Sequence, residues 1–433
     1  MVYYSTNGQA PLVSFKEATI NGQAPDLGLY FPEIIPAAEQ QMIKDIEKTA
    51  DEEIAFRVIR PYVGAAIPEE KLYEIVSETV NFPIPLLTVT ENSSALELFH
   101  GPTLAFKDIG ARFMSRCLGY FVQNDTRKVT VLVATSGDTG GAVASGFYNV
   151  EGVEVIILYP SGKVSPVQEK QLTTLGNNIQ ALEVDGSFDD CQRMVKSAFA
   201  DPIITEQLFL TSANSINVAR WLPQQFYYYF AYKQWADKNN PPVISVPSGN
   251  FGNICAGILA MQAGLPVKHF IAACNANDVV TSYLETEKLV PKASVATLSN
   301  AMDVGNPSNF VRILEIFHRQ FSDLKEKLSS YSINDTDTLA AIREVYKQHQ
   351  YLLDPHGAVG YIALQRYLKQ YPQDKGIFLE TAHPVKFPEA VKKGTGQKIE
   401  IPESLSTIMD KEKHAIFIGT GYEQFRELLL SRQ

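Results

Sequence analysis

The sequence predicts an α/β protein built on parallel β-sheet, with a small, mainly helical domain at its N-terminus. Short runs rich in Val and Ile recur along the chain, and a Gly/Ser/Asn/Asp turn and a helical pattern follow each run. Near-continuous apolar strands that alternate with helices are typical of parallel sheets covered on both faces. The length of 433 residues suggests two or three domains with a large buried core.

The N-terminal part of the chain differs from the rest. Charge-rich helical stretches dominate it, at residues 37–51 and 68–79, and Pro83 and Pro85 close the segment. Helical patterns without strand-sized apolar runs indicate a separate unit. We therefore predict an N-terminal domain over residues 1–90.

Six strand–turn units follow in the predicted catalytic domain, residues 91–385. A loop at 236–241 separates two open parallel lobes, and residues 386–433 are expected to form a helical C-terminal extension. Ligands of parallel sheets bind just beyond the carboxyl ends of the strands, so the turns after these strands are the candidate site. The predicted strands are residues 129–134, 153–159, 179–184, 243–246, 269–274 and 376–379.

Composition excludes several classes of function. The chain has 38 basic and 48 acidic residues and a net charge of −10, which argues against a general nucleic-acid binder. The N-terminus lacks the pattern of a signal peptide, and the apolar runs are too short to span a bilayer. The cysteines stand alone, without zinc-ligand spacing, which predicts a reducing, cytoplasmic setting and no metal; they are Cys117, Cys191, Cys255 and Cys274.

A lysine heads a predicted helix after the turn at residues 100–106. Ala111, Met114 and Leu118 follow Lys107 at helical spacing, and such an apolar stripe normally faces a core. A lysine there must snorkel, pair with an acid such as Asp108, or become a Schiff-base nucleophile through partial desolvation. The pattern alone favours a snorkelling or paired lysine.

Two turns have the form of anion sites. In the first, Ser136, Asp138 and Thr139 lie between a strand and a helix, where free backbone N–H groups can bind a carboxylate or phosphate. The alternative is an ordinary turn in which Asp138 or Thr139 caps the helix. The second turn matches neither the P-loop nor the dinucleotide motif, but its amides can hold a phosphate; it comprises Gly249, Asn250, Phe251, Gly252 and Asn253.

Further polar residues follow other predicted strands. Two clusters, at residues 162–170 and 212–220, combine a cation with hydrogen-bonding side chains. They fit a second anion pocket, or equally solvated surface charge. Thr381 directly follows a strand, and its hydroxyl can bind a ring nitrogen or cap a turn.

Together these segments resemble the threonine synthase family over nearly the whole chain. The resemblance is strongest to the branch with an extra N-terminal domain, which includes the enterobacterial and fungal enzymes. Gly141 and Val385 stand where many members have Ala, and neither position carries a predicted role. The matching segments are residues 28–32, 100–108, 136–140, 162–170, 212–217, 246–252, 299–304, 354–356 and 381–384.

The resemblance implies a pyridoxal-phosphate enzyme of fold type II, the tryptophan-synthase-β-like class, with the cofactor between the two lobes. Lys107 would hold pyridoxal 5′-phosphate as a Schiff base, and residues 249–253 would bind its phosphate. Thr381 would face the pyridine nitrogen and leave it largely unprotonated. Asp138 stands where many relatives carry Asn beside the 3′ oxygen of the cofactor, so its protonation state is open.

The resemblance also implies the substrate and the reaction. The turn from Ser136 to Thr139 would bind the substrate carboxylate, and Lys163, Asn217 and Arg220 would bind its phosphate. O-phospho-L-homoserine and water would become L-threonine and phosphate, by γ-elimination and β-hydration in threonine biosynthesis. The enzyme would be a monomer that binds neither nucleic acid nor a membrane.

Three alternatives remain open at this point. Another fold type II lyase, such as a serine/threonine dehydratase or a cysteine synthase, shares the lysine and the glycine loop but needs no second phosphate pocket. A non-catalytic homologue would bind the cofactor without turnover. A phosphate-binding module would bind phosphate and no cofactor.

Overall fold

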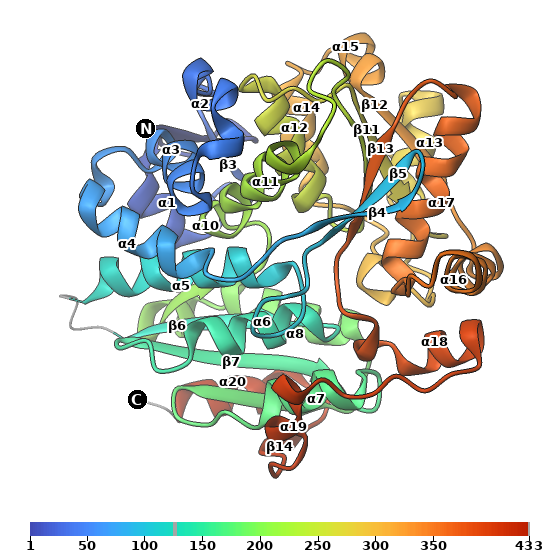
Figure 1. Cartoon of the computed structure of the whole chain (residues 1–433). Coiled ribbons are helices and arrows are strands. Elements are labelled where there is room, and N and C mark those ends of the chain that lie inside the picture. Colours follow the sequence, from blue (N-terminus) through green and yellow to red (C-terminus); the bar gives the residue numbers. More distant parts are fainter. Residues whose placement is uncertain (124–127, 432–433) are drawn as a thin grey trace.

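The computed structural model describes residues 1–123 and 128–431 and contains three β-sheets in these ranges (Figure 1). A three-stranded sheet has the order β2-β1-β3, a six-stranded sheet β12-β11-β10-β13-β5-β4, and a five-stranded sheet β14-β8-β7-β6-β9. The two larger sheets are parallel except where β4 (Leu86–Thr90) runs antiparallel to β5 (Ser93–Glu97). The predicted α/β class with two parallel lobes is confirmed.

The strands predicted from apolar runs lie inside the two larger sheets. Side chains of β6 alternate between two cores: Val131 and Val133 face α5, and Leu132 and Ala134 face α8. Burial on both faces explains why these strands are apolar throughout. Their bounds are β6 (Val129–Ala134), β7 (Val153–Pro160), β8 (Ile179–Val184), β10 (Val243–Pro247), β11 (His269–Cys274) and β13 (Gly376–Glu380).

Among the described residues, four strands of the two larger sheets were not expected from the sequence, and each lies at the edge of a sheet. They are β4, β9 (Phe209–Ser212), β12 (Leu328–Ser332) and β14 (Ala415–Ile418). Each is only partly buried, so none requires a continuous apolar run. The extension at 386–433, expected to be helical, contains three α-helices in its described part and also β14, which pairs with β8.

Helices cover both faces of each large sheet. In Figure 1, α12 (Gly252–Gln262) and α17 (Pro355–Gln370) lie on opposite sides of the six-stranded sheet. On the five-stranded sheet, α6 (Asp138–Phe147) packs beside α5 (Lys107–Val122), and α8 (Phe188–Ala200) covers the other face. The others in this domain are α7 (Pro166–Thr173), α9 (Pro202–Gln207), α10 (Val218–Trp221), α11 (Phe226–Gln234), α13 (Val279–Thr286), α14 (Phe310–Ile316), α15 (Phe321–Lys327) and α16 (Asp335–His349).

Helix α5 is held tightly between its neighbours by two glycines. A Cβ at Gly110 would lie 2.6 Å from the Arg220 carbonyl oxygen, and one at Gly146 would lie 3.0 Å from the Ala111 carbonyl carbon. Only glycine permits such close approach of helix backbones. The start of α5, at Lys107, is therefore fixed relative to α6 and α10.

The N-terminal region combines helices with a small antiparallel sheet. Helix α1 begins with a capping box between Ser14 and Glu17. The stretch at 37–51 contains α2 and a separate 3₁₀ turn, Ile46–Lys48, rather than one helix. The elements are β1 (Val2–Ser5), β2 (Val13–Ser14), β3 (Tyr30–Pro32), α1 (Phe15–Asn21), α2 (Gln40–Lys44), α3 (Asp51–Val63) and α4 (Glu69–Thr79).

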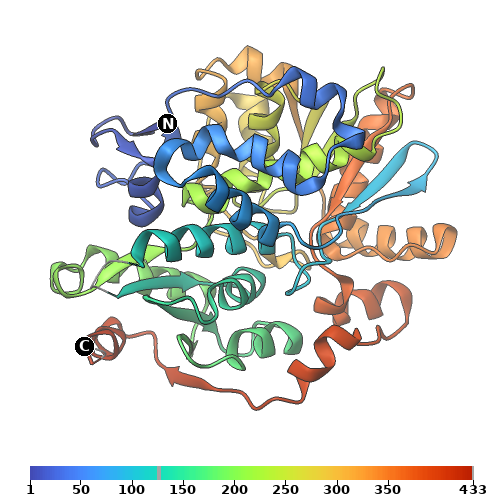
Figure 2. The same ribbon diagram turned by 60° about the vertical axis from the view of Figure 1, so that its left-hand side comes forward.

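The C-terminal segment begins beside α16 and then runs along the outside of the five-stranded lobe (Figure 2). It contains α18 (Pro388–Thr395), α19 (Glu403–Met409), β14 and α20 (Tyr422–Leu430). In the described ranges, no helix is long and apolar enough to cross a membrane.

Candidate active site

The order of strands brings three predicted site segments together at the carboxyl ends of strands in the six-stranded sheet. Strands β10, β13 and β5 are neighbours and run parallel. The loop at 248–253 follows β10, Thr381 follows β13, and the segment leading to Lys107 follows β5. The backbone N–H of Phe106 donates to the Thr381 carbonyl at 2.9 Å, so Thr381 lies beside the start of α5.

Lys107 is the first residue of α5, and its side chain is 15% exposed. Its Nζ lies 3.8 Å from Oδ2 of Asp138, which begins α6 in the other lobe. Burial lowers the pKa of Lys107 below its ordinary value, and the Asp138 carboxylate opposes this shift. The alternative of a pair with Asp108 is wrong, because that carboxylate accepts the N–H and hydroxyl of Thr103 at 2.9 and 2.6 Å.

Asp138 is buried and ionised. Its Oδ1 accepts hydrogen bonds from Nζ of Lys386 at 2.7 Å and Nε2 of Gln168 at 2.9 Å. Burial alone would raise the pKa of Asp138, but the ammonium groups of Lys386 and Lys107 outweigh it and hold this pKa well below its usual range. Sequence analysis left this protonation state open and missed both Lys386 and Gln168.

The turn that contains Ser136 and Thr139 leaves the start of α6 open. The N-cap residue, Gly137, has a φ of 134° and no capping side chain. The hydroxyl of Thr135 accepts the N–H groups of Gly137 and Gly140 at 2.9 and 2.8 Å and so shapes the turn. Ser136 and Thr139 are half-buried. Thr135 thus takes up the N–H of Gly140, the third residue of α6, and the N–H groups of Asp138 and Thr139 remain at the helix start to bind a carboxylate.

The loop before α12 presents a second helix N-terminus, where Oδ1 of Asn253 accepts the N–H of Ile254 at 2.9 Å and the backbone amides before Ile254 remain for a ligand. Its N-cap residue, Phe251, is left-handed with a φ of 62° and has no capping side chain. The Asn250 amide donates to Ser215 Oγ at 2.7 Å and accepts the N–H of Ser308 at 2.7 Å. Asn253 donates to the Pro247 carbonyl at 2.8 Å. Both asparagine side chains therefore shape the loop, and its backbone amides are the groups suited to a phosphate.

A second loop, which contains Ala301, packs against the loop at 248–253. A Cβ at Gly249 would lie 2.8 Å from the Ala301 carbonyl oxygen, so the two backbones touch. The N–H of Ala301 donates to Nε2 of His356 at 3.2 Å, and Nδ1 of His356 pairs with Asp354 at 2.6 Å. Asp354 caps α17. This Asp–His pair belongs to a matched segment for which the sequence indicated no role.

A buried acid lies directly before Thr381. Glu380 accepts the N–H of Asp354 through one oxygen, and its Oε1 has no partner among the described residues. Burial, followed by the nearby Asp354 carboxylate, raises the pKa of Glu380 well above its ordinary value. Burial and Asp354 therefore favour the neutral form of Glu380, directly before Thr381.

The three residues predicted for the substrate phosphate lie in different environments. Arg220 is 3% exposed, donates to the Ala213 carbonyl at 2.9 Å, and leaves its Nε without a partner among the described residues. Burial lowers its pKa to about 10, so it remains a cation. Lys163 is exposed in the loop before α7, and no hydrogen bond or ion pair in the described ranges joins it to the other predicted site residues.

The prediction for Asn217 is wrong. Its Oδ1 caps α10 by accepting the N–H of Ala219 at 2.9 Å. Its Nδ2 donates to the carbonyls of Thr19 and Ser212 at 2.8 and 3.3 Å. The side chain is fully buried, so this amide is committed to the protein and is not free to bind a phosphate.

The groups in this site fit pyridoxal phosphate. Lys107 offers an amine whose pKa is lowered by burial, and the start of α12 offers backbone amides for a phosphate. The hydroxyl of Thr381, a residue 5% exposed, has no hydrogen-bond partner among the described residues. A free hydroxyl can donate a hydrogen bond to an unprotonated ring nitrogen.

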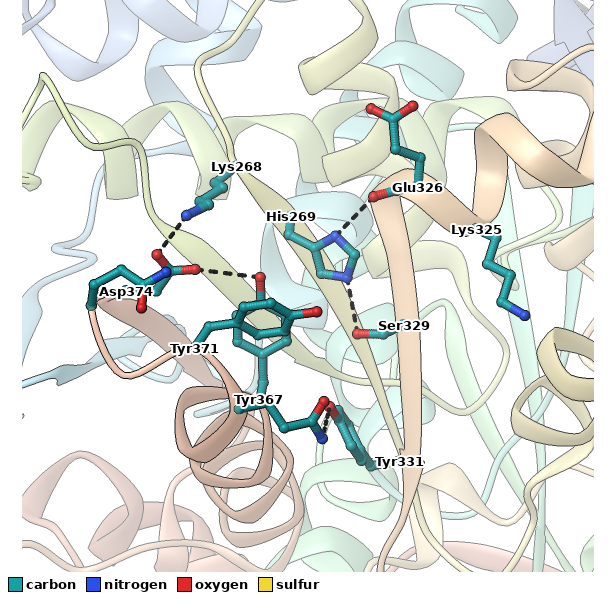
Figure 3. Close-up of a pocket in the computed structure, with 11 residues that line it drawn as sticks. Lys268, His269, Lys325, Glu326, Ser329, Tyr331, Tyr367, Tyr371 and Asp374 are labelled. Atoms are coloured by element: carbon teal, nitrogen blue, oxygen red, sulfur yellow. Dashed lines mark hydrogen bonds and ion pairs between the residues drawn. The ribbon is translucent and has the colours of Figure 1, made fainter.

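A separate hollow lies at the opposite ends of the strands, near the start of β11 in the six-stranded sheet (Figure 3). His269, which begins β11, bonds to Ser329 at 2.9 Å, and Lys268 pairs with Asp374 at 2.5 Å. These groups satisfy one another, and none of the predicted site residues lines the hollow. The candidate site is therefore the one around Lys107.

Three known families match parts of the chain. Residues 93–380 match the family described as pyridoxal-phosphate dependent enzyme. Residues 2–80 match the threonine synthase N terminus, and residues 357–428 match the threonine synthase C-terminal family. The two flanking matches are specific to threonine synthases, so they favour this family over the dehydratases.

Individual relatives agree over the full length. Threonine synthase from Serratia marcescens is 45% identical, with 99% of each chain covered. The crystal structure of threonine synthase from Escherichia coli has a TM-score of 0.93 at 42% identity and covers 100% of both chains. A pyridoxal-phosphate-bound threonine synthase from Brucella melitensis has a TM-score of 0.92 at 33% identity, covering 99% of this chain and 98% of that one. The chain belongs to the threonine synthase family of pyridoxal-phosphate-dependent enzymes.

Proposed function

We propose that this enzyme converts O-phospho-L-homoserine and water to L-threonine and phosphate, with Lys107 as its catalytic residue. The observation that carries the proposal is the position of Lys107. Its amine lies 3.8 Å from the ionised Asp138, which begins α6. The first backbone amides of α6 and α12 supply two anion sites, and the reaction requires one for the substrate carboxylate and one for the cofactor phosphate.

Residues on both lobes would hold the cofactor. Backbone amides at 249–253 bind its phosphate, Lys107 forms the Schiff base, and the hydroxyl of Thr381 faces the ring nitrogen. Asn250 and Asn253 act through the shape of the loop, because their side chains bond to the protein. When bound, pyridoxal phosphate withdraws electrons from the α carbon of the substrate and so makes its proton removable.

Other residues would orient the substrate and move its protons. The Ser136–Thr139 turn binds the carboxylate, and the buried guanidinium of Arg220 is the favoured ligand of the leaving phosphate. Lys163 remains a second candidate, because its loop follows β7 at the carboxyl edge of the five-stranded sheet. The Lys107 amine takes the α-proton and then serves as the mobile base for the β and γ carbons.

Product analysis tests this function directly. We expect threonine and phosphate in equal amounts from O-phospho-L-homoserine when pyridoxal phosphate is present. Phosphate with 2-oxobutanoate and no threonine would contradict the hydration step. Lys107→Ala should abolish turnover and near-violet absorption while the protein stays folded, and the exposed Lys393→Ala should retain both. Near-normal turnover by Lys107→Ala would overturn the role of Lys107.

We also propose that the enzyme is a cytoplasmic monomer with domains at 1–90, 91–385 and 386–433. The family match at residues 2–80 supports the first domain, and the four cysteines, all buried and free, support a reducing compartment. Light scattering of the purified holoenzyme should give a mass near 48.0 kDa. A mass twice as large would contradict the monomer.

A further inference from the structure

Lys386 is a second buried lysine beside Lys107. It ends a 3₁₀ turn, Pro384–Lys386, and is 0% exposed. Burial of an ammonium group is costly unless it is paired and hydrogen-bonded. Its Nζ has two partners, Asp138 Oδ1 at 2.7 Å and the Thr103 carbonyl at 2.9 Å. The reaction proposed above gives this residue no part.

The two lysines compete for one carboxylate, and Lys386 is the closer. Oδ1 of Asp138 is occupied by Lys386 and Gln168 at 2.7 and 2.9 Å. Oδ2 lies 3.8 Å from Lys107 Nζ, which is beyond hydrogen-bond distance. The negative charge of Asp138 is therefore neutralised mainly by Lys386, and Lys107 lacks a tight counter-ion.

We propose that Lys386 is a positioning residue that pairs with Asp138 and so leaves Lys107 free to act as a neutral amine. This inference rests on the proposed role of Lys107 as the cofactor lysine. A lysine attacks a carbonyl or removes a proton only in its neutral form. Without Lys386, the Asp138 carboxylate would hold Lys107 as an ammonium ion.

The charges that face Lys107 come from several elements. Burial lowers its pKa most, and the cations Lys386 and Arg220, from the 3₁₀ turn and α10, lower it further. Asp138 from α6 and Asp354 from α17 raise it. Loss of Lys386 would remove one of the cations and expose Lys107 to an unpaired carboxylate. Both changes raise the pKa of Lys107.

Attachment of the cofactor to Lys107 provides the test. Full-length enzyme is stripped of cofactor and mixed with pyridoxal phosphate across a pH series, and attachment is followed by absorption and located by borohydride reduction and peptide mapping. In Lys386→Met, we expect the pH midpoint of the attachment rate to rise by about one unit, so that attachment is about tenfold slower at neutral pH. The Thr103 carbonyl keeps a donor in this variant, because Gln171 bonds to it at 3.0 Å.

Paired variants separate this role from support of the fold. Lys386→Arg retains the cation and should keep the wild-type midpoint. The double variant Asp138→Asn/Lys386→Met removes both charges and should return the midpoint toward wild type, whereas a structural defect would persist. Lys393→Met, an exposed lysine on α18, is the matched control.

Each result decides the question. An unchanged midpoint in Lys386→Met, or a double variant that does not recover, would overturn the inference. If Lys386→Met does not fold, the inference still requires that Lys386→Arg and the double variant both attach the cofactor with the wild-type midpoint. A shifted midpoint in either variant would then overturn it. If wild-type enzyme attaches the cofactor at a residue other than Lys107, the proposed function fails and the inference falls with it.

Discussion

Gly249→Ala should weaken binding of the cofactor by a predictable amount. The added Cβ would lie 2.7 Å from Met302 Cα and 2.8 Å from the Ala301 carbonyl oxygen. Both atoms belong to backbone, so no side-chain rotation can relieve the contact. One of the two loops must recede by about 0.7 Å to reach the 3.4 Å at which ordinary contact begins.

The loop that contains Ala301 has little freedom to move away. The N–H of Ala301 is bonded to His356, which is paired with the buried Asp354. The strain therefore falls on the loop that presents its amides to the cofactor phosphate. Overpacking of this kind costs about 1–3 kcal/mol. If that free energy is lost from binding, the Kd for pyridoxal phosphate rises about 5- to 150-fold.

Equilibrium titration of cofactor-free enzyme with pyridoxal phosphate measures this change. Gly421→Ala is the matched control, because no atom lies within 4 Å of the Cβ that it would add; its Kd should equal that of wild type. A Kd for Gly249→Ala within twofold of wild type would refute the reasoning. It would show that the contact with residues 301–302 does not set the shape of the cofactor loop.

Three further predictions follow from buried polar groups. Asn217→Ala should lower the free energy of unfolding by about 1–3 kcal/mol without changing KM for O-phospho-L-homoserine; a raised KM at unchanged stability would make Asn217 a ligand after all. Arg312→Met removes the donors to three backbone carbonyls. It should lower the free energy of unfolding in urea by about 3–5 kcal/mol. A decrease below about 1 kcal/mol would show that these hydrogen bonds do not stabilise the fold. Glu380 keeps its proton in the folded state, whereas the unfolded chain releases it above the ordinary pKa of 4.5, so wild type loses stability as pH rises. Glu380→Gln should therefore gain in Tm relative to wild type as pH rises above about 5, and a pH-independent difference would contradict the raised pKa of Glu380.

The sequence predicts best what depends on local pattern. Strands such as β6 are buried on both faces, and their apolar runs identify them. The edge strand β14 is a four-residue run that leaves Phe417 60% exposed, and no periodicity separates so short a run from a helix. Lys107 became a candidate because it heads a helical stripe after a Gly-Pro turn, but that local pattern favoured a snorkelling or paired lysine, and its predicted role came from the resemblance to threonine synthases.

The partners of the site residues could not be predicted in the same way. Asn250 and Asn253 lie in the loop before α12, where they were predicted to bind the cofactor, but their side chains bond to Ser215 and Pro247 and not outward. Lys386 pairs with Asp138 across the two lobes. Its one signal in the sequence is a lysine between apolar residues, which is equally typical of a snorkelling side chain.

The N-terminal domain contributes none of the predicted ligands, yet it is connected to the cofactor loop through buried side chains. The fully buried Arg312 donates to the Tyr30 carbonyl of β3 and to the carbonyls of Ser215 and Ile216. Ser215 Oγ in turn accepts the amide of Asn250 at 2.7 Å. One chain of hydrogen bonds therefore runs from the N-terminal sheet to the loop that we propose binds the cofactor phosphate. Since a phosphate site depends on the positions of backbone amides, this domain belongs to the geometry of the active site.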